Sequence, residues 1–596
     1  MNVPGVDECL IQRDREGDWL LFTAPRAVHV ATRLDQVMFV LDQVVDAVER
    51  ESLWAAGFIS YEAAPGFDAN LRVRTGTRTP LLWFALYGAP TIVPAAALAR
   101  LRIAQQSAIP DWQVSLSRRE FAERVQRIRQ YIAAGDNYQT NFTLRLEAPI
   151  LEAPWQLFLR MCHGHASRCG AYVDAGDFVV ASASPELLLR MEGDDLVSRP
   201  MKGTAPRGRF TGEDRACGDA LRASEKNCAE NLMIVDMVRN DMSRVATLGS
   251  VRTEALFAVE RYPSLLTLTS TVRARSSAGI GEVLRAMFPA ASITGAPKRR
   301  TMQIIAELES TPRGVYTGSV GFIAPNRRAQ FNVAIRTAVV ERATRTVEFG
   351  VGGGIVWDST SAGEYDECLL KARVVTQAPR EFELLETLRW QPDTGFVLLD
   401  RHLDRLLDSA HYFDFFVDIA AVRERLMASI AGMSIPLRVR LLLARAGEVS
   451  VAVESLEGAV FAAPSQQRGA TIDVALADAA IDAQDVFLLH KTTQRAAYDA
   501  CLATARARNG NIADVLLWNG NGEITESTIA NVVVEIDGMR CTPPVECGLL
   551  AGTLRAELLA QGLIKEARLT MRDIRERATR VWLINSVRGW REVRIV

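Results

Sequence analysis

The sequence lacks the features that mark a membrane, secreted or nucleic-acid-binding protein. No apolar run is long enough to span a bilayer, and the first residues show no basic region followed by an apolar core. Basic and acidic residues nearly balance, with 69 Lys and Arg against 71 Asp and Glu, so no excess positive charge exists for nucleic acid or an anionic membrane. We therefore expect a cytoplasmic protein whose ligands are small molecules or other proteins.

Motifs for disulfides, thiolate metal sites and nucleotides are also missing. The nine Cys form no C-x-x-C pair and no cluster with the six His, so we expect free, mostly buried thiols. In F-G-V-G-G-G-I-V-W-D-S, Ile355 stands where G-x-G-x-x-G requires its last glycine, and no Walker-type G-K-[ST] occurs. Nucleotide binding therefore has no support in the sequence.

The length and patterning indicate two unrelated domains. A chain of 596 residues exceeds what one hydrophobic core usually serves, and a polar segment near Gln377 separates two strongly patterned regions. We therefore expect one domain at 1–377 and another at 378–596. The predicted fold class is an α/β and α+β multidomain protein.

Each region has its own secondary-structure pattern. The first predicts long helices at 117–134 and 220–245 and apolar strands at 177–183 and 331–340, which is typical of a large α/β or α+β domain. The second predicts strand pairs around Ala446-Gly447 and Asp537-Gly538, both hairpin turns. Helices are expected there at 399–411, 493–507 and 553–561.

Three carboxylates of the first region could converge on a hard cation. Glu230 lies near the start of a predicted helix on which residues 232, 235 and 238 mark the apolar face. Glu364 and Glu367 are three apart, so they would project side by side from a helix. Oxygen ligands of this kind suit Mg2+. From spacing alone, however, we favour an ordinary solvated helix face.

The glycines just before this acidic pair predict a flexible turn. In Gly350–Gly354, exposed N–H groups could receive a carboxylate close to the N-terminus of a helix. A turn at a strand end without any ligand explains the same pattern equally well.

Read together, the short motifs of the first region resemble one family. They occur in this order: S-A-S-P-E (182–186), P-M-K-G-T (200–204), A-E-N-L-M-I-V-D (229–236), I-T-G-A-P-K (293–298), R-G-x-Y-x-G (313–318), A-I-R-T (334–337) and E-Y-D-E-C-L-L-K-A (364–372), preceded by G-F-I-S-Y-E-A (57–63) and G-D-N-Y-Q-T-N (135–141). This series resembles the chorismate-utilising enzymes, which include anthranilate synthase, isochorismate synthase and aminodeoxychorismate synthase component I. The resemblance covers most of residues 30–375 and implies a large α/β sandwich domain.

The resemblance implies a magnesium site and a substrate site. Glu230 and Glu367, with Glu364 beside them, would hold the Mg2+ that receives the ring carboxylate of chorismate. Other residues would contact the substrate's carboxylates, because an Arg fork and backbone N–H groups suit that task; these are Arg336, Thr294, Gly352, Gly353, Gly354 and, in an assisting role, Lys371.

Lys202 distinguishes between members of the family. Anthranilate synthases carry Ala at the matching position, whereas aminodeoxychorismate synthases carry Lys, which would attack C2 of chorismate as hydroxide leaves C4. Glu186 would act as general acid or base for the departing oxygen. Many relatives have His where this chain has Thr267, so a group that assists loss of the hydroxyl is missing. No glutamine-amidotransferase motif is present, which implies a separate amidotransferase subunit as the ammonia source.

The second region resembles the fold-type IV pyridoxal-phosphate enzymes. The motifs are H-L-D-R-L (402–406), H-K-T-T-Q-R-A-A-Y (490–498), G-E-I-T-E-S-T-I-A-N (522–531) and G-L-L-A-G-T-L-R (548–555). The resemblance implies that Lys491 binds pyridoxal 5'-phosphate covalently and that Glu526 faces its pyridine nitrogen. Arg405 and the turn through Thr553 and Leu554 would hold the phosphate. Some relatives have Thr or Ser in place of Leu554. A homodimer through this domain is possible.

The final motif N-S-V-R-G-W (585–590) is more similar to the lyases of this group than to its transaminases. We therefore expect a fusion of the two activities that make 4-aminobenzoate for folate biosynthesis: amination of chorismate to aminodeoxychorismate, followed by elimination of pyruvate. Two alternatives stay open, namely an anthranilate synthase fused to a branched-chain or D-amino-acid transaminase, and a chorismate-binding scaffold without turnover.

Overall fold

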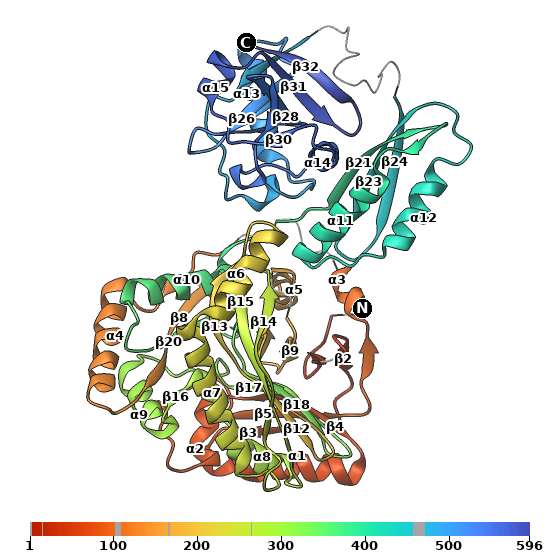
Figure 1. Cartoon of the computed structure of the whole chain (residues 1–596). Helices are drawn as coiled ribbons and strands as arrows, with labels where there is room; N and C mark the ends of the chain where they lie inside the picture. Colours follow the sequence, from red (N-terminus) through yellow and green to blue (C-terminus); the bar gives the residue numbers. More distant parts are fainter. Residues whose placement is uncertain are drawn as a thin grey trace. The chain divides into compact units, whose positions relative to one another are not determined.

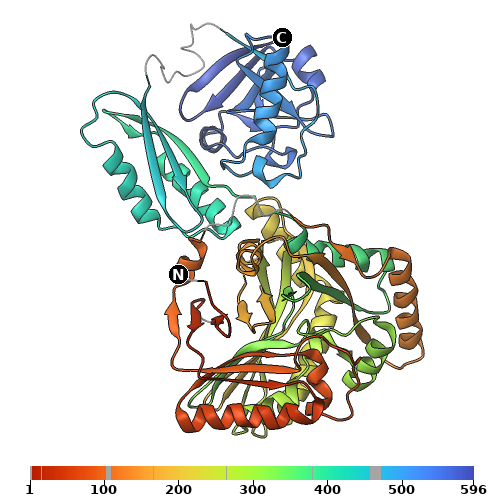
Figure 2. The ribbon, with the colours of Figure 1, turned by 180° about the vertical axis from the view of Figure 1, so that it is seen from behind.

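The computed structural model describes residues 3–14, 16–101, 109–164, 167–263, 265–378, 380–456 and 471–596. The chain divides into two compact units, which we describe separately (Figures 1 and 2). Unit 1 comprises Met1–Arg207 and Cys217–Pro379, and unit 2 comprises Gly208–Ala216 and Arg380–Val596. A short segment that the sequence analysis assigned to the first domain thus belongs to unit 2.

Unit 1 contains two antiparallel sheets of ten strands each. The order of the first is β16 (Gly295–Ala296), β8 (Gln139–Pro149), β20 (Thr346–Ile355), β19 (Thr337–Glu341), β10 (Phe178–Ser182), β9 (Ala171–Asp174), β1 (Cys9–Gln12), β2 (Trp19–Phe22) and β6 (Thr91–Val93), with β7 (Gln113–Val114) pairing to β8. The order of the second is β13 (Met201–Pro206), β15 (Leu265–Arg275), β12 (Asp195–Arg199), β11 (Leu187–Glu192), β18 (Arg328–Asn332), β17 (Ser319–Ala324), β4 (Trp54–Ile59), β5 (Leu82–Tyr87) and β3 (Ala27–Ala31), with β14 (Arg252–Tyr262) pairing to β15.

Helices cover the outer faces of both sheets, which makes four layers (Figure 1). Side chains such as Phe22, Phe58 and Val180 fill the space between the sheets. One outer core involves α1 (Val37–Glu51), α7 (Glu225–Ser243) and α8 (Ile280–Met287), and the other involves α4 (Arg118–Ala133), α5 (Pro154–Gly164) and α10 (Ser361–Thr376). The remaining helices are α2 (Ala64–Phe67), α3 (Ala95–Ala99), α9 (Lys298–Leu308) and α6 (Thr211–Ala223), the last of which begins in the segment assigned to unit 2. The predicted α/β sandwich is confirmed, and its doubly covered sheets explain the nearly continuous apolar strands.

Two predicted elements of unit 1 are in fact divided. The helical pattern at 220–245 contains the end of α6 and then α7, because Ser224 caps α7 by accepting a hydrogen bond from Asn227 N. Leu232 is 44% exposed, so the buried face of α7 runs through Ile234, Val235 and Val238 instead. The predicted strand at 331–340 is the end of β18 followed by β19, interrupted at Arg336, whose φ is 49°.

Unit 2 contains a four-stranded sheet with two helices and an eight-stranded mixed sheet. The first is ordered β22 (Gly395–Phe396), β21 (Leu384–Gln391), β23 (Leu437–Leu443) and β24 (Val449–Ser455), and α11 (Leu399–Phe413) and α12 (Ile419–Ser429) pack on it. The second is ordered β27 (Ile524–Ser527), β26 (Asp514–Trp518), β25 (Ile472–Leu476), β32 (Gly589–Ile595), β31 (Arg580–Asn585), β28 (Asn531–Ile536), β29 (Met539–Thr542) and β30 (Lys565–Glu566), accompanied by α13 (Ala496–Arg508), α14 (Thr553–Ala560) and α15 (Met571–Glu576). The two predicted hairpins, β23–β24 and β28–β29, are confirmed.

The segment Gly208–Ala216 is held in unit 2 by polar contacts. The Tyr412 hydroxyl donates a hydrogen bond of 2.7 Å to the carbonyl of Gly208. Arg209 donates to the carbonyl of Ala483 at 3.0 Å, and its own carbonyl lies 3.2 Å from His490 Nε2. This segment therefore packs beside the residue that precedes Lys491.

The described residues include no helix that is both long and apolar enough to cross a membrane. All nine cysteines are free, as the sequence analysis expected, and five of them are buried.

A buried ion pair joins several segments of unit 1. The Arg313 side chain is 1% exposed and donates to both Glu309 carboxylate oxygens, at 3.0 and 2.7 Å. Nη1 donates at 2.8 Å to the carbonyl of Ile293, and Nη2, which also donates to Glu309, donates at 2.8 Å to the carbonyl of Asn141. Glu309 also accepts hydrogen bonds from the amide and hydroxyl of Thr143. One guanidinium thus connects the R-G-x-Y-x-G motif to β8 and to the turn before β16.

We predict that Arg313→Met destabilises unit 1 by about 3 kcal/mol or more, because the substitution leaves the buried Glu309 carboxylate without its main partner. Denaturant unfolding should show an earlier transition for unit 1. Arg119→Met is the matched control, because the Arg119 side chain is 88% exposed and its pairing with Glu123 contributes little. Equal unfolding midpoints for the two variants would contradict the prediction.

Candidate active sites

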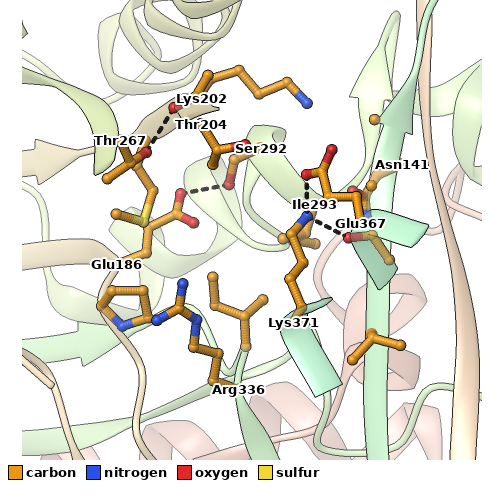
Figure 3. Close-up of a pocket in the computed structure, with 18 of the residues that line it drawn as sticks. Asn141, Glu186, Lys202, Thr204, Thr267, Ser292, Ile293, Arg336, Glu367 and Lys371 are labelled. Carbon is orange, nitrogen blue, oxygen red and sulfur yellow. Dashed lines mark hydrogen bonds and ion pairs between the residues drawn. The ribbon is translucent and has the colours of Figure 1, made fainter. Parts of the chain in front are cut away.

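A cavity of about 390 Å³ in unit 1, the first cavity, is lined by ten of the eleven residues predicted there. They are Glu186, Lys202, Glu230, Arg336, Gly352, Gly353, Gly354, Glu364, Glu367 and Lys371. Figure 3 labels some of these side chains. Thr294 is the exception: it is fully buried, and its hydroxyl donates at 3.0 Å to the carbonyl of Ala290. Its predicted contact with a substrate is therefore not supported by the orientation of its side chain.

The carboxylates of the first cavity are paired with lysines and a hydroxyl. Lys371 Nζ lies 2.8 Å from Glu367, and Lys202 Nζ lies 3.9 Å from Glu230. Glu364 accepts a 2.7 Å hydrogen bond from the Ser359 hydroxyl. Lys371 lowers the pKa of Glu367, whereas burial raises the pKa of Glu364, and the negative charge of Glu367 raises it further. Glu364 and Glu367 therefore act on each other electrostatically, as expected for neighbours on α10.

The chemistry of these oxygen donors fits Mg2+, a hard cation that prefers carboxylates. As the side chains lie in the structure, however, no group of three or more His, Cys, Asp or Glu in the described residues is placed to hold a metal ion. One oxygen of Glu367, Oε1, is paired with the ammonium group of Lys371. The magnesium site thus stays a prediction.

Glu186 has the environment of a carboxylic acid that can hold a proton near neutral pH. It is 4% exposed, and burial raises its pKa to about 7. The Ser292 hydroxyl donates a 2.6 Å hydrogen bond to it (Figure 3). The sequence analysis did not single out Ser292, which lies one residue before the I-T-G-A-P-K motif.

Arg336 presents its guanidinium to the first cavity from the irregular link between β18 and β19 (Figure 3). Arg336 has a positive φ, which interrupts the extended backbone at this link. Burial lowers the pKa of Arg336 to about 10, so the guanidinium stays cationic at neutral pH. A cation in this position suits a carboxylate ligand.

The predicted glycine turn is wrong, because Gly350–Gly354 lie within β20 and pair with β8. The glycines are needed for close approach instead. A Cβ at Gly354 would stand 2.2 Å from Lys202 Nζ and 2.8 Å from Gln139 Nε2. A Cβ at Gly353 would stand 2.9 Å from a carboxylate oxygen of Glu364. This strand therefore leaves room for the polar side chains of the first cavity.

Gln139 is a residue that the sequence analysis quoted within a motif but did not select. It is fully buried, and neither its amide nitrogen nor its amide oxygen has a hydrogen-bond partner in the described part of the chain. Thr267, which stands where many relatives have His, lines the first cavity. Its hydroxyl donates a 2.9 Å hydrogen bond to the carbonyl of Gly203.

A second cavity of about 350 Å³, in unit 2, is lined by all five residues predicted there, namely Arg405, Lys491, Glu526, Thr553 and Leu554. Burial lowers the pKa of Lys491 to about 8, which raises the fraction of neutral amine while the cation still predominates at neutral pH. Burial raises the pKa of Glu526 to about 7, and this carboxyl accepts hydrogen bonds from Tyr498 at 2.8 Å and Leu550 N at 3.1 Å.

The donor set of the second cavity fits pyridoxal phosphate. A Cβ at Gly552 would stand 1.9 Å from Asn531 Oδ1, so only glycine fits at the position that precedes α14. This leaves the first N–H groups of α14, beginning at Thr553, at a cavity that Arg405 also lines. A cation and a helix N-terminus are a common combination for binding phosphate. The sequence analysis did not select Ser586 on this wall or Glu386 and His402 behind it, although His402 and Ser586 both lay within quoted motifs.

The comparisons agree with this division. Residues 7–377 match the family model described as chorismate binding enzyme, and residues 383–596 match amino-transferase class IV. Anthranilate synthase component 1 of Streptomyces coelicolor is 42% identical over 275 residues, which is 46% of this chain and 53% of that protein. Aminodeoxychorismate synthase component 1 of Bacillus subtilis is 39% identical over 260 residues, 43% of this chain and 55% of that protein. The chain thus spans about half the length of these curated relatives.

A solved structure has the same fold as unit 1. Anthranilate synthase component I from Streptococcus pneumoniae matches with a TM-score of 0.52 and 24% identity, covering 63% of this chain and 93% of that one. The protein belongs to the chorismate binding enzyme family and carries a class IV aminotransferase domain after it.

We predict that Gly354→Ala slows chorismate consumption about 100-fold, because the new methyl group displaces the Lys202 amine and the Gln139 amide, which both lie against Gly354. Steady-state assays with Mg2+ and ammonium measure the effect. Gly88→Ala is the control, because no atom lies within 4 Å of a Cβ there. Equal rates for the two variants would contradict the prediction, provided that both melt at the wild-type temperature.

Proposed function

We propose that the chain converts chorismate into 4-aminobenzoate in two reactions, with domain 1–377 making aminodeoxychorismate and domain 378–596 eliminating pyruvate from it. The proposal rests on the amine of Lys202, which lines the first cavity. In the same chain, Lys491 and Glu526 line the second cavity. A lysine at the first position is what an amination at C4 requires and what an anthranilate synthase lacks.

In the first reaction, Lys202 Nζ forms a bond to C2 of chorismate while the C4 hydroxyl leaves. Glu186 protonates the departing oxygen, which leaves as water, and its raised pKa suits this role. Ammonia then attacks C4, the bond between Nζ and C2 breaks, and the surplus proton returns to Glu186. Arg336 holds a substrate carboxylate throughout.

Mg2+ would be held by Glu230, Glu364 and Glu367, where it neutralises the ring carboxylate and fixes its orientation. Lys371, which donates to the carbonyl of Gly352 at 2.8 Å, remains available as a cation beside this group. The ammonia comes from a separate glutamine amidotransferase subunit, as the component 1 names of the relatives suggest. We place the protein in the cytoplasm, and a homodimer through the second domain is part of the same proposal.

In the second reaction, bound pyridoxal phosphate supplies a sink for the electron pair left at C4 of the substrate, and Glu526 keeps its ring nitrogen protonated. Lys491 in its neutral form removes the C4 proton. The bond between C3 and the ether oxygen then breaks, and the three-carbon group leaves and becomes pyruvate. Formation of an aromatic ring makes this step strongly favourable. No second amino acid is needed.

Charge in the second cavity favours a substrate with two carboxylates. Six of the described residues that line it are cationic and two are acidic. Arg405 and Lys491 are assigned to the cofactor, Arg438 pairs with Glu454 at 3.2 Å, and Arg495 pairs with Asp499 at 3.8 Å. Two cations remain for a substrate, namely Arg440 and Arg588. A branched-chain amino acid has one carboxylate, whereas aminodeoxychorismate has two, so this lining supports the lyase over a branched-chain transaminase.

The test combines two single variants of the full chain. Lys491→Ala should consume chorismate and accumulate aminodeoxychorismate, whereas Lys202→Ala should release 4-aminobenzoate only from supplied aminodeoxychorismate. Mixing them should restore 4-aminobenzoate production from chorismate after a lag that shortens as protein concentration rises. Chromatography distinguishes 4-aminobenzoate from anthranilate. Anthranilate as the product, or no product from wild type, would refute the proposal.

We further predict that Arg440→Gln raises the KM for aminodeoxychorismate about tenfold with little change in kcat, because a hydrogen bond between two charged groups is lost. Arg425→Gln is the control: Arg425 is also an exposed arginine of unit 2, but it lies on α12 and does not line the cavity. A KM that is unchanged by Arg440→Gln would remove this arginine from the substrate site.

A further inference from the structure

Two hydroxyl groups on the wall of the second cavity share one partner behind that wall. Thr553 Oγ1 lies 3.2 Å and Ser586 Oγ lies 3.0 Å from the same nitrogen, His402 Nε2. Thr553 is the first residue of α14, and Ser586 directly follows β31. Both line the cavity, whereas His402 is only 1% exposed. One buried imidazole therefore connects two separate elements of the wall.

The other ring nitrogen is fixed by a carboxylate. His402 Nδ1 lies 2.6 Å from Glu386 Oε2, and Glu386 also accepts hydrogen bonds from Arg405 at 2.9 and 2.7 Å. Burial alone would raise the pKa of Glu386, but Arg405 and His402 outweigh it and hold the pKa at about 2. Because an ionised carboxylate only accepts hydrogen bonds, Nδ1 carries the proton.

This anchoring determines what Nε2 can do. Burial lowers the pKa of His402, and the positive charges of Arg405 and Lys491 act in the same direction, while Glu386 opposes them. In the neutral ring, Nε2 has a single lone pair and accepts a hydrogen bond from one hydroxyl at a time. The other hydroxyl keeps its proton free for a ligand in the cavity. The same Glu386 that anchors the imidazole also orients Arg405, so three cavity-facing groups depend on one buried pair.

We propose that His402 is a positioning residue for a phosphate monoester: it holds the Thr553 and Ser586 hydroxyls at the cavity wall, so that the hydroxyl not bonded to Nε2 donates to a phosphate oxygen beside the Arg405 guanidinium. The inference deepens the proposed function, on which it rests for the identity of the phosphate compound. It assigns to the first residue of H-L-D-R-L a role distinct from that of Arg405 in the same motif. His402 touches the hydroxyls and not the ligand, so its effect must depend on the phosphate group.

The experiment compares two ligands that differ only in the phosphate. Cofactor-free full-length protein is titrated with pyridoxal 5'-phosphate and with pyridoxal, and binding is followed by absorbance without any substrate. His402→Gln should weaken pyridoxal phosphate binding about tenfold or more, the size expected for a hydrogen bond to a charged group, and change pyridoxal binding less than about twofold. His411→Gln, an exposed position on the same helix α11, is the control and should leave both affinities unchanged.

A second variant separates positioning from a general loss of structure. When Thr553→Val and Ser586→Ala are already present, adding His402→Gln should weaken pyridoxal phosphate binding no further. Equal weakening for both ligands, or a full additional loss in the triple variant, would overturn the proposal. If the phosphate dependence holds but wild type forms no 4-aminobenzoate, the proposed function fails and the role of His402 stands, because the titration involves no catalysis.

Discussion

The guanidinium of Arg313 fixes the parts of unit 1 from which the first cavity is built. Ile293 and Asn141, whose carbonyls it holds, both line the cavity, and Ser292, the partner of Glu186, precedes Ile293 directly. A buried cation needs an acceptor in each direction in which it donates, and Glu309 with these two carbonyls supplies them. The segment whose Ser292 hydroxyl donates to Glu186 is thus held in place by the acceptors that a buried charge requires.

The sequence predicted best the residues whose relative positions are determined by a regular helix. Glu364 and Glu367 lie on α10 as their spacing requires, and their electrostatic influence on each other is the expected consequence. Spacing could not reveal Thr294, whose hydroxyl turns to a local carbonyl as Thr side chains often do at the end of a helical turn. A pattern of residue types gives positions along the chain, but not which of two nearby polar partners a side chain takes.

The glycines of β20 illustrate a second limit. Four glycines in five residues are typical of a flexible turn, and the sequence contains nothing that contradicts it. In the fold, the same residues form a paired strand. Glycine is needed there because neighbouring side chains occupy the space that a Cβ would fill. The relevant neighbours, Lys202 and Gln139, are more than a hundred residues away in sequence, so only the tertiary structure shows why glycine is required. Gln139 and Glu386 were missed for the same reason.

The two cavities meet the same chemical demand in different ways. On the proposed function the ligands are chorismate and its aminated product, both dicarboxylates, so each site would have to hold two negative charges and still release the ligand. Around the first cavity, lysines and carboxylates are interleaved, and each carboxylate described already has a partner. Such a site is close to neutral and gains attraction for an anion only when a cation joins it. The second cavity carries its surplus of arginine permanently. On the proposed function, loss of the metal would therefore remove the attraction of the first site for the aminated product. The arginines of the second site would still attract it.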